Sequence, residues 1–182
     1  MKYIVLLRGI NISGKNKVDM KTLKEELLKN NLNNVITYLN SGNIILETDL
    51  NKEKLTNLFA KILETKFNIN IPIFILNLKE LEEIYLNSPT YYLTKDKNAY
   101  YNLIFLKNIT YEKILEEIGE PSKYDKITPS KNVIYWSFDL NNYQKSNWWI
   151  KTASTYVKNY ITIRTFNTIK KLYELANKEG NS

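Results

Sequence analysis

The hydrophobic residues in the first half of the chain form strand-like runs separated by helical stripes. Short apolar runs typical of β-strands occupy residues 3–7, 35–39, 44–47 and 73–76. Between them, apolar residues recur at helical spacing, first after Asp19, which can cap a helix, and again over residues 55–63. A short helix is expected at residues 79–86. The order β-α-β-β-α-β predicts a ferredoxin-like half.

The second half repeats this order with little similarity in residues. Strand-like runs occupy residues 100–107, 124–128, 133–138 and 160–164. Thr110 and Ser146 can cap the two intervening helices, and a last helix is expected at residues 166–178. The apolar stripe expected for the helix after Ser146 consists of Trp149, Ile150, Ala153, Tyr156 and Val157.

We therefore predict an α+β protein of two tandem ferredoxin-like halves with antiparallel sheets and an extra C-terminal helix. The halves are expected at residues 1–87 and 99–182, with residues 88–98 as the linker. The first strand is apolar on both faces, since Ile4 and Leu6 alternate with the equally apolar Tyr3, Val5 and Leu7. An antiparallel sheet with one face in water would show polar residues there. Each sheet therefore needs a second cover, from the other sheet or from a dimer partner, and the protein is a monomer or a homodimer.

The residue types narrow the chemistry. The chain of 182 residues has no cysteine and no histidine, which excludes disulfides, thiolate zinc sites, cysteine nucleophiles and Ser-His catalysis. We predict no metal site, no cofactor and no catalytic residue. The apolar run before Arg8 is too short for a signal peptide, and no run approaches the roughly 20 residues that span a bilayer. A cytoplasmic location without membrane contact is expected.

The net charge of +7 favours a nucleic-acid partner at first sight. However, the lysines are scattered and often lie beside glutamate, as in KTLKEELLK, which is typical of solvated helix faces. The chain has only two arginines, Arg8 and Arg164. A guanidinium fork suits bidentate binding of carboxylate or phosphate, but it serves equally well as a clamp on internal groups.

The segment LLRGINISGKNKV resembles the start of a P-loop, because Gly9 is followed after four residues by Gly14-Lys15. A P-loop requires Ser or Thr next, whereas this chain has Asn16, and it requires a parallel sheet with a helix that begins at the lysine. The helical pattern here begins near Asp19. A P-loop is therefore disfavoured, and a structural connection and a different ligand site remain open.

In a ferredoxin-like half, the first two strands run in the same direction, so the loop after the first strand and the 40–43 hairpin turn emerge at the same end of the sheet. This places the loop at residues 8–17 beside the NSGN turn. We predict a binding site for a small anionic ligand at this end.

Three blocks carry a family resemblance: LLRGINISGKNKVDMKTLKEEL, YLNSGNIIL and TIRTFNTIKKLYEL. They resemble the signature blocks of the bacterial "domain of unknown function 1697" family across nearly the whole chain. The resemblance implies tandem α+β halves and no established activity. Departures are Ser13, Asp19, the Thr165-Phe166 pair and the lack of a glycine-containing stretch before Ser146. The matching positions that we take as candidate ligand contacts are Arg8, Gly9, Asn11, Gly14, Lys15, Asn16, Lys17, Ser41, Gly42, Asn43, Arg164, Asn167 and Thr168.

Three functions follow from these patterns. The first is a binding module for a nucleotide or phosphorylated metabolite, because the motif positions are neutral or basic and offer no general base. The second is nucleic-acid binding, in which tyrosines at positions 91, 92, 100 and 101 would stack bases. The third is an enzyme without histidine or cysteine chemistry, which is the weakest because its carboxylate pairs lie on solvated helix faces.

Overall fold

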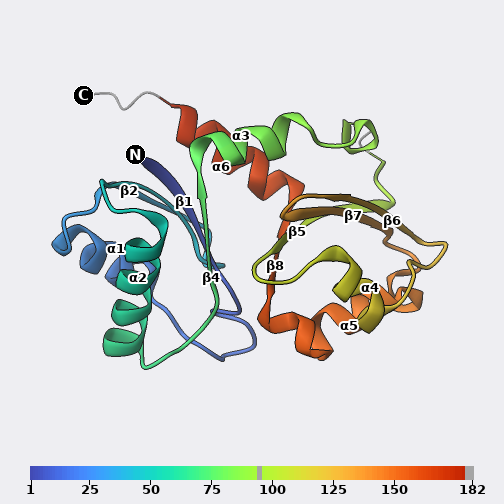
Figure 1. The fold of residues 1–182 in the computed structure, drawn as a ribbon, viewed down its shortest axis with the longest axis horizontal. Helices are drawn as coiled ribbons and strands as arrows, with labels where there is room; N and C mark the ends of the chain where they lie inside the picture. Colours follow the sequence, from blue (N-terminus) through green and yellow to red (C-terminus); the bar gives the residue numbers. More distant parts are fainter. Residues whose placement is uncertain (94–95, 179–182) are drawn as a thin grey trace. The chain divides into compact units, whose positions relative to one another are not determined.

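The computed structural model describes residues 1–93 and 96–178 (Figure 1). Residues 94–95 of the predicted linker and 179–182 of the predicted second half lie outside the described residues. Contacts group the chain into two compact units, Met1–Glu83 together with the chain from Lys171 onward, and Ile84–Lys170.

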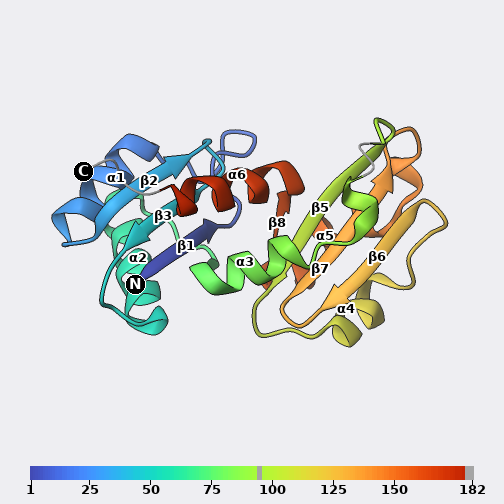
Figure 2. The same ribbon diagram turned by 90° about the horizontal axis from the view of Figure 1, so that it is seen from above.

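The first unit contains one antiparallel sheet and two helices on one of its faces. Its elements are β1 (Lys2–Leu7), α1 (Met20–Lys29), β2 (Asn33–Tyr38), β3 (Asn43–Glu47), α2 (Lys52–Phe67), β4 (Ile73–Asn77) and the start of α3 (Leu78–Leu86). The strand order is β2-β3-β1-β4, and every neighbouring pair is antiparallel. Figure 2 shows β2, β3 and β1 side by side. This confirms the ferredoxin-like order predicted for the first half.

Both faces of β1 are buried. Val5 and Leu7 belong to a core that includes Leu23 from α1 and Phe59 from α2. Ile4 and Leu6, on the other face, have 0% exposure, which confirms the expectation that neither face of this strand is in water. On the N-terminal side of β1, the Lys2 ammonium donates a 2.7 Å hydrogen bond to the carbonyl of Ala176 in α6 (Phe166–Asn177).

The second unit repeats the architecture. Its elements are η1 (Thr90–Leu93), β5 (Ala99–Leu106), α4 (Tyr111–Ile118), β6 (Asp125–Ser130), β7 (Val133–Asp139), η2 (Tyr143–Lys145), α5 (Asn147–Ser154), η3 (Tyr156–Asn159), β8 (Ile161–Thr165) and the start of α6. The sheet is antiparallel with the order β6-β7-β5-β8. One of its faces packs against α4 and α5 through Ile114, Ile118 and Trp148.

Part of the predicted linker covers the other face of this second sheet. Tyr92 in η1 is 4% exposed, and its hydroxyl donates to the carbonyl of Asn102 in β5. Its ring contacts Tyr101, Tyr135 and Phe166 with centroid separations of 5.0, 5.8 and 5.0 Å. The second cover therefore comes in part from the connecting segment itself, which the sequence pattern did not indicate.

The two units do not divide at the predicted linker alone. The division falls between residues 83 and 84 in α3 and between residues 170 and 171 in α6. The C-terminal turns of α6 thus group with the first unit, through contacts such as the Tyr173 hydroxyl to a Glu82 carboxylate oxygen at 3.4 Å. The division into 1–87 and 99–182 as separate domains stays a prediction.

The stripe predicted for the helix after Ser146 is wrong. Ser146 caps α5, with its hydroxyl accepting from the Trp149 N–H at 3.0 Å. However, α5 buries Trp148 and Thr152, while Trp149 and Ile150 are exposed. The helix also ends at Ser154, so Tyr156 lies in the separate turn η3 and is exposed. Tertiary packing decides which of the two adjacent tryptophans is buried. Trp148 lies in the core, and its indole N–H donates to the Gly119 carbonyl.

Candidate functional site

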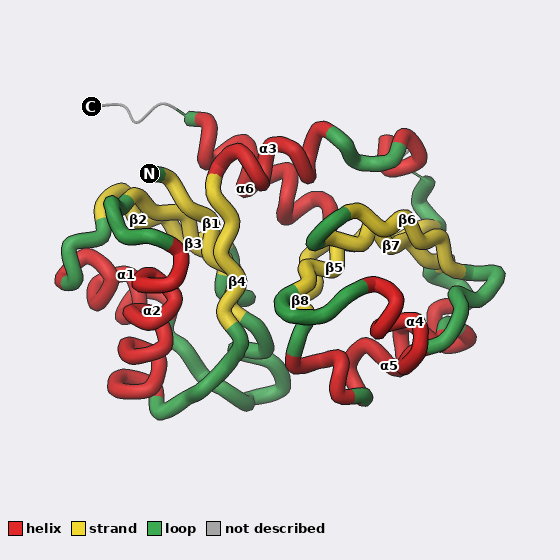
Figure 3. The backbone as a smooth tube through the Cα atoms, in the orientation of Figure 1, coloured by secondary structure: helices red, strands yellow, loops and turns green. Residues whose placement is uncertain are grey.

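The loop between β1 and α1, one of the green segments of Figure 3, contains a miniature hairpin with an antiparallel bridge between Ile12 and Lys15. Its turn residues Ser13 and Gly14 have φ values of 48° and 76°, and the Lys15 N–H donates to the Ile12 carbonyl at 2.9 Å. Two left-handed residues in succession are the signature of a type I′ turn. The Asn11 N–H continues the pairing with the Asn16 carbonyl at 3.1 Å.

Five of the eight residues 9–16 have a positive φ, namely Gly9, Asn11, Ser13, Gly14 and Asn16. Three of them are not glycine, and the left-handed conformation costs a non-glycine residue about 1–2 kcal/mol, less for asparagine. Such a backbone persists only where its surroundings hold it in place. This loop therefore has one defined conformation that its surroundings hold in place.

Asn11 is the residue that holds the loop. Its amide group donates to the carbonyls of Val18 at 2.9 Å and Asn40 at 2.8 Å, and its side-chain oxygen accepts from the Val18 N–H at 2.9 Å. Asn16 adds a bond from its amide to the Gly9 carbonyl at 3.0 Å. The loop is thereby tied to the start of α1 and to the β2–β3 turn, which confirms that both loops emerge at one end of the sheet.

We expect Asn11→Ala to release this end of the first unit. The substitution removes three hydrogen bonds and replaces asparagine, which tolerates the left-handed backbone better than alanine does, so unfolding should become easier by about 1–3 kcal/mol. Chemical denaturation measures the loss. Amide hydrogen exchange should also rise more at Val18, through local opening of the loop, than at the centre of β1, where it follows only the global loss of stability. Equal exchange at both positions would show that Asn11 does not act locally.

The β2–β3 turn is equally well specified. The Leu7 N–H donates to the Gly42 carbonyl at 2.8 Å. Asn43 is fully buried, and its amide donates to the Tyr38 carbonyl at 2.9 Å and the Ser41 hydroxyl at 3.0 Å. These bonds give Asn43 a structural role, and a ligand contact by Asn43 stays a prediction.

The exposed polar residues at this end include Ser13, Lys15, Lys17 and Ser41, besides the exposed Asn11 and Asn16, whose amides bond within the loop. Arg8 is half-buried, and its backbone N–H donates to the Pro72 carbonyl at 3.1 Å. Burial lowers the pKa of its guanidinium, because desolvation disfavours the charged form. The same low dielectric strengthens its attraction to any anion that reaches it.

The N-terminus of α1 is already capped. The Asp19 carboxylate accepts from the Thr22 N–H at 2.8 Å and the Thr22 hydroxyl at 2.7 Å, and the bond from the backbone N–H is the main cause of the lowered pKa of Asp19. A negative charge thus occupies the position where a helix would otherwise attract an anion. At the helix end the exposed Lys21 therefore lies beside this carboxylate, whereas Lys15 and Lys17 lie on the loop.

The P-loop geometry is not adopted at residues 8–20. β1 is antiparallel to both of its neighbours, and α1 begins at Met20 rather than at Lys15. Lys15 follows the turn of the miniature hairpin instead of opening a helix. GINISGK therefore resembles the phosphate-binding motif in sequence but does not adopt its backbone conformation.

The third signature block lies in the second unit. Arg164 is buried and donates from Nη1 to the Thr162 hydroxyl at 2.9 Å and to the Ile163 carbonyl at 2.8 Å. The Thr165 hydroxyl accepts from the Thr168 N–H at 3.2 Å, which caps α6. Asn167 is exposed. These bonds match the internal clamp that the sequence left open for an arginine, and the joining of Arg164, Asn167 and Thr168 to the Arg8 loop stays a prediction.

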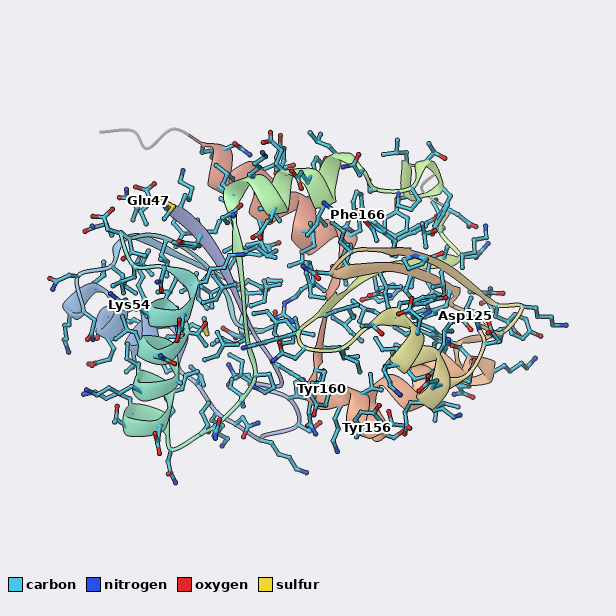
Figure 4. All side chains as sticks on the ribbon, viewed as in Figure 1. Glu47, Lys54, Asp125, Tyr156, Tyr160 and Phe166 are labelled. Atoms are coloured by element: carbon cyan, nitrogen blue, oxygen red, sulfur yellow. The ribbon has the colours of Figure 1, made fainter. Side chains whose placement is uncertain are left out.

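A polar centre that the sequence pattern did not indicate lies in the second unit at Asp125, labelled in Figure 4. Its Oδ1 accepts from the Trp136 indole N–H at 2.8 Å and from the Ser146 hydroxyl at 2.7 Å. Its Oδ2 accepts from the Ser122 hydroxyl at 2.6 Å and the Ser122 N–H at 3.2 Å. The SKYD spacing was the only local signal, since the other partners are distant in sequence.

Within residues 1–93 and 96–178, no three acidic residues lie close enough together to hold a metal ion. No helix in the same ranges is both long and apolar enough to cross a bilayer.

Two antiparallel sheets in tandem, each with its helices, define the class of this protein as a tandem ferredoxin-like α+β protein. The loop after its first strand is a tightly specified basic hairpin. The chain belongs to the DUF1697 family, whose model, described as "Protein of unknown function (DUF1697)", matches residues 1–135. That range contains the first two signature blocks, and the block with Arg164 lies beyond it.

The chain is also similar to a solved structure, that of a conserved bacterial protein from Streptococcus pneumoniae. The two share 26% sequence identity with a TM-score of 0.84, over 97% of this chain and 98% of the other. The comparison confirms the α+β fold of both units. Among curated proteins no match is found.

Proposed function

We propose that the β1–α1 loop and the β2–β3 turn form a binding site for a small anionic ligand, such as a nucleotide or a phosphorylated metabolite. The observation that carries this proposal is the backbone of residues 9–16, five of which are left-handed. Strain of this kind gathers at functional sites, because binding needs groups that are held in advance.

The motif residues fall into two groups, one that holds the loops and one that can reach a ligand, and this supports the same function. Asn11, Asn16 and Asn43 use their side-chain amides within the two loops, whereas Lys15 and Lys17 extend from them into solvent. Lys15 and Lys17 would supply point charges, Ser13 a hydroxyl, and Arg8 a planar fork for a phosphate group. A non-enzymatic role and a cytoplasmic location stay predictions.

We expect phosphate, sulfate or ATP to raise the melting temperature of the wild-type protein. At about one hundred times the dissociation constant the gain is about 2.7 kcal/mol, which corresponds to roughly 5–10 °C for a chain of this size. In the Lys15→Gln/Lys17→Gln variant the shift should vanish while the melting temperature without ligand stays the same, because both side chains are exposed.

The matched control is Lys54→Gln/Lys61→Gln, which removes the same charge from exposed positions on α2 in the same unit. Equal loss of the shift in both variants would assign the effect to net charge and reject the site. Arg8→Lys provides a second control. If Arg8 binds the anion, this variant loses the shift but not its intrinsic stability, whereas a structural clamp would lose stability without any anion.

A further inference from the structure

The second unit carries exposed aromatic rings that are held rigidly by other rings. Tyr100 on β5 is 40% exposed and Trp149 on α5 is 43% exposed. Both contact the buried Phe138, with centroid separations of 5.5 and 5.2 Å. Tyr143 in η2 contacts Trp149 edge-on at 5.2 Å. We call Tyr100, Tyr143 and Trp149 the aromatic platform.

Lysines border this platform. The Lys145 ammonium lies 5.5 Å from the centre of the Tyr124 ring, and the Lys123 ammonium lies 5.2 Å from the same ring. Tyr143 and Lys145 belong to the same turn, η2, and the Lys145 ammonium also donates to the Asn142 amide oxygen at 3.0 Å. Tyr124 lies next to the strand that carries Phe138, because its carbonyl accepts from the Asp139 N–H at 3.1 Å. Residues 140–173 contain no aspartate or glutamate at all. The surface around α5 is therefore suited to a negatively charged partner.

The acidic residues of the neighbouring helix α4 lie on the opposite flank of α5. Asn147 and Lys151, four residues apart, both donate to the Ile118 carbonyl at the end of α4 at 3.0 Å, so this flank of α5 faces α4. At about 100° per residue, Trp149 lies about 200° around the helix from Asn147. The platform is thus turned away from the glutamates of α4.

Two acidic groups lie close to the lysines. Asp139, at the end of β7, accepts from the Asn142 amide and the Asn141 N–H, both at 2.8 Å. The bond from the Asn142 amide is the main cause of the lowered pKa of Asp139, and the bond from the Asn141 N–H adds to it. Asp125 accepts from the hydroxyl of Ser146, the residue after Lys145. Lys123 and Lys145 are thus matched by these two carboxylates, and the excess positive charge comes from the rest of residues 140–173.

We propose that the aromatic platform binds single-stranded nucleic acid, with bases stacked on Trp149 and Tyr100 and phosphates contacted by Lys145 and Lys123. Stacking on rigid rings beside basic side chains is the general mode by which proteins hold single strands without reading sequence. A membrane surface fits less well, because these rings are braced by neighbouring rings instead of projecting alone. The proposal concerns the second unit and is independent of the anion site in the first.

The experiment is fluorescence anisotropy of labelled oligothymidylate and oligouridylate of about 12 nucleotides, within the usual site size, with the full-length protein at low salt. Trp149→Ala should weaken binding by about 5- to 150-fold, the usual value of one stacked base, and Trp149→Phe should restore most of it. Stacking should also quench tryptophan emission, since Trp136 and Trp148 are buried and Trp149 is the accessible ring.

The contribution of Lys123 and Lys145 is measured separately, through the salt dependence of binding. The slope of log K against log salt should fall by about 1.4 in Lys123→Gln/Lys145→Gln, at about 0.7 per phosphate contact on a single strand. The control pair Lys54→Gln/Lys61→Gln in the first unit should leave the slope unchanged.

Several outcomes would overturn the proposal. They are an affinity that Trp149→Ala leaves unchanged, an equal loss in the control lysine pair, or no binding of either oligonucleotide at low salt. The proposal is also rejected if Trp149→Ala abolishes binding to anionic vesicles but not to oligonucleotides. If Tyr100→Ala instead converts a dimer into a monomer, the platform is an interface between two copies of the chain.

Discussion

Gly42→Ala is expected to destabilise the first unit by about 2–5 kcal/mol, because the added methyl group has no space on a left-handed backbone. Gly42 has a φ of +77°, and a Cβ built on it would lie 2.6 Å from the Cβ of Leu7 and 3.0 Å from Cδ1 of Ile10. Leu7 is part of the buried strand β1, and its Cβ cannot move without the backbone. The left-handed conformation adds about 1–2 kcal/mol, and overpacking adds about 1–3 kcal/mol.

Gly14→Ala is the matched control. Gly14 has nearly the same φ, +76°, but no atom lies within 4 Å of the added Cβ. It should therefore cost only the conformational part, about 1–2 kcal/mol. The difference between the two variants, measured by urea denaturation, isolates the collision with β1. If both variants lose the same stability, the close packing of the turn on Leu7 is not what requires glycine at position 42.

Asp125→Ala should be the most damaging substitution of a polar residue in the second unit, at about 2–5 kcal/mol. Its carboxylate accepts from the Trp136 indole and the Ser146 hydroxyl, and both of these residues are buried. Each buried donor left without a partner costs about 1–3 kcal/mol. Ser146 also caps α5, so the start of that helix should fray.

Asp139→Ala provides the comparison for this prediction. It removes a carboxylate from the same unit whose partners, Asn141 and Asn142, lie in a turn that water reaches, so it should cost much less stability than Asp125→Ala. Asp125→Asn keeps the shape but places an amide N–H against a donor, and it should fall between the two. Near-equal melting temperatures for Asp125→Ala and Asp139→Ala would contradict the structural importance of Asp125.

Much of the local structure follows from the sequence. Asp19, Thr110 and Ser146 each cap the helix they were expected to cap, because a short acceptor side chain before an apolar stripe satisfies free N–H groups whatever surrounds it. The antiparallel order of each sheet also followed, since the alternation of strand runs and helical stripes admits few connections. The burial of Ile4 and Leu6 was visible as two apolar faces on one strand.

Other features depended on contacts between distant residues. Asn11 was selected as a candidate ligand contact, yet its amide joins Val18 and Asn40, a role that needs the two loops to be adjacent. The η1 turn with Tyr92 was predicted to be part of the linker. A pattern of four residues does not show that the segment packs on a sheet, or on which of its faces. The sequence also did not show which face of α5 is buried, since the adjacent Trp148 and Trp149 are equally apolar.

By itself, the sequence determined the fold class, the helix caps and the position of a basic loop beside the NSGN turn. These depend on short-range chemistry, namely periodicity, capping and turn preference, which neighbouring residues set among themselves. Only the tertiary structure decided which tryptophan is buried, that Asp125 holds Trp136 and Ser146, and that the GINISGK loop is a hairpin held by Asn11. The reason is physical: a buried hydrogen bond or a packed ring needs a partner brought from elsewhere in the chain, and no local pattern records that partner.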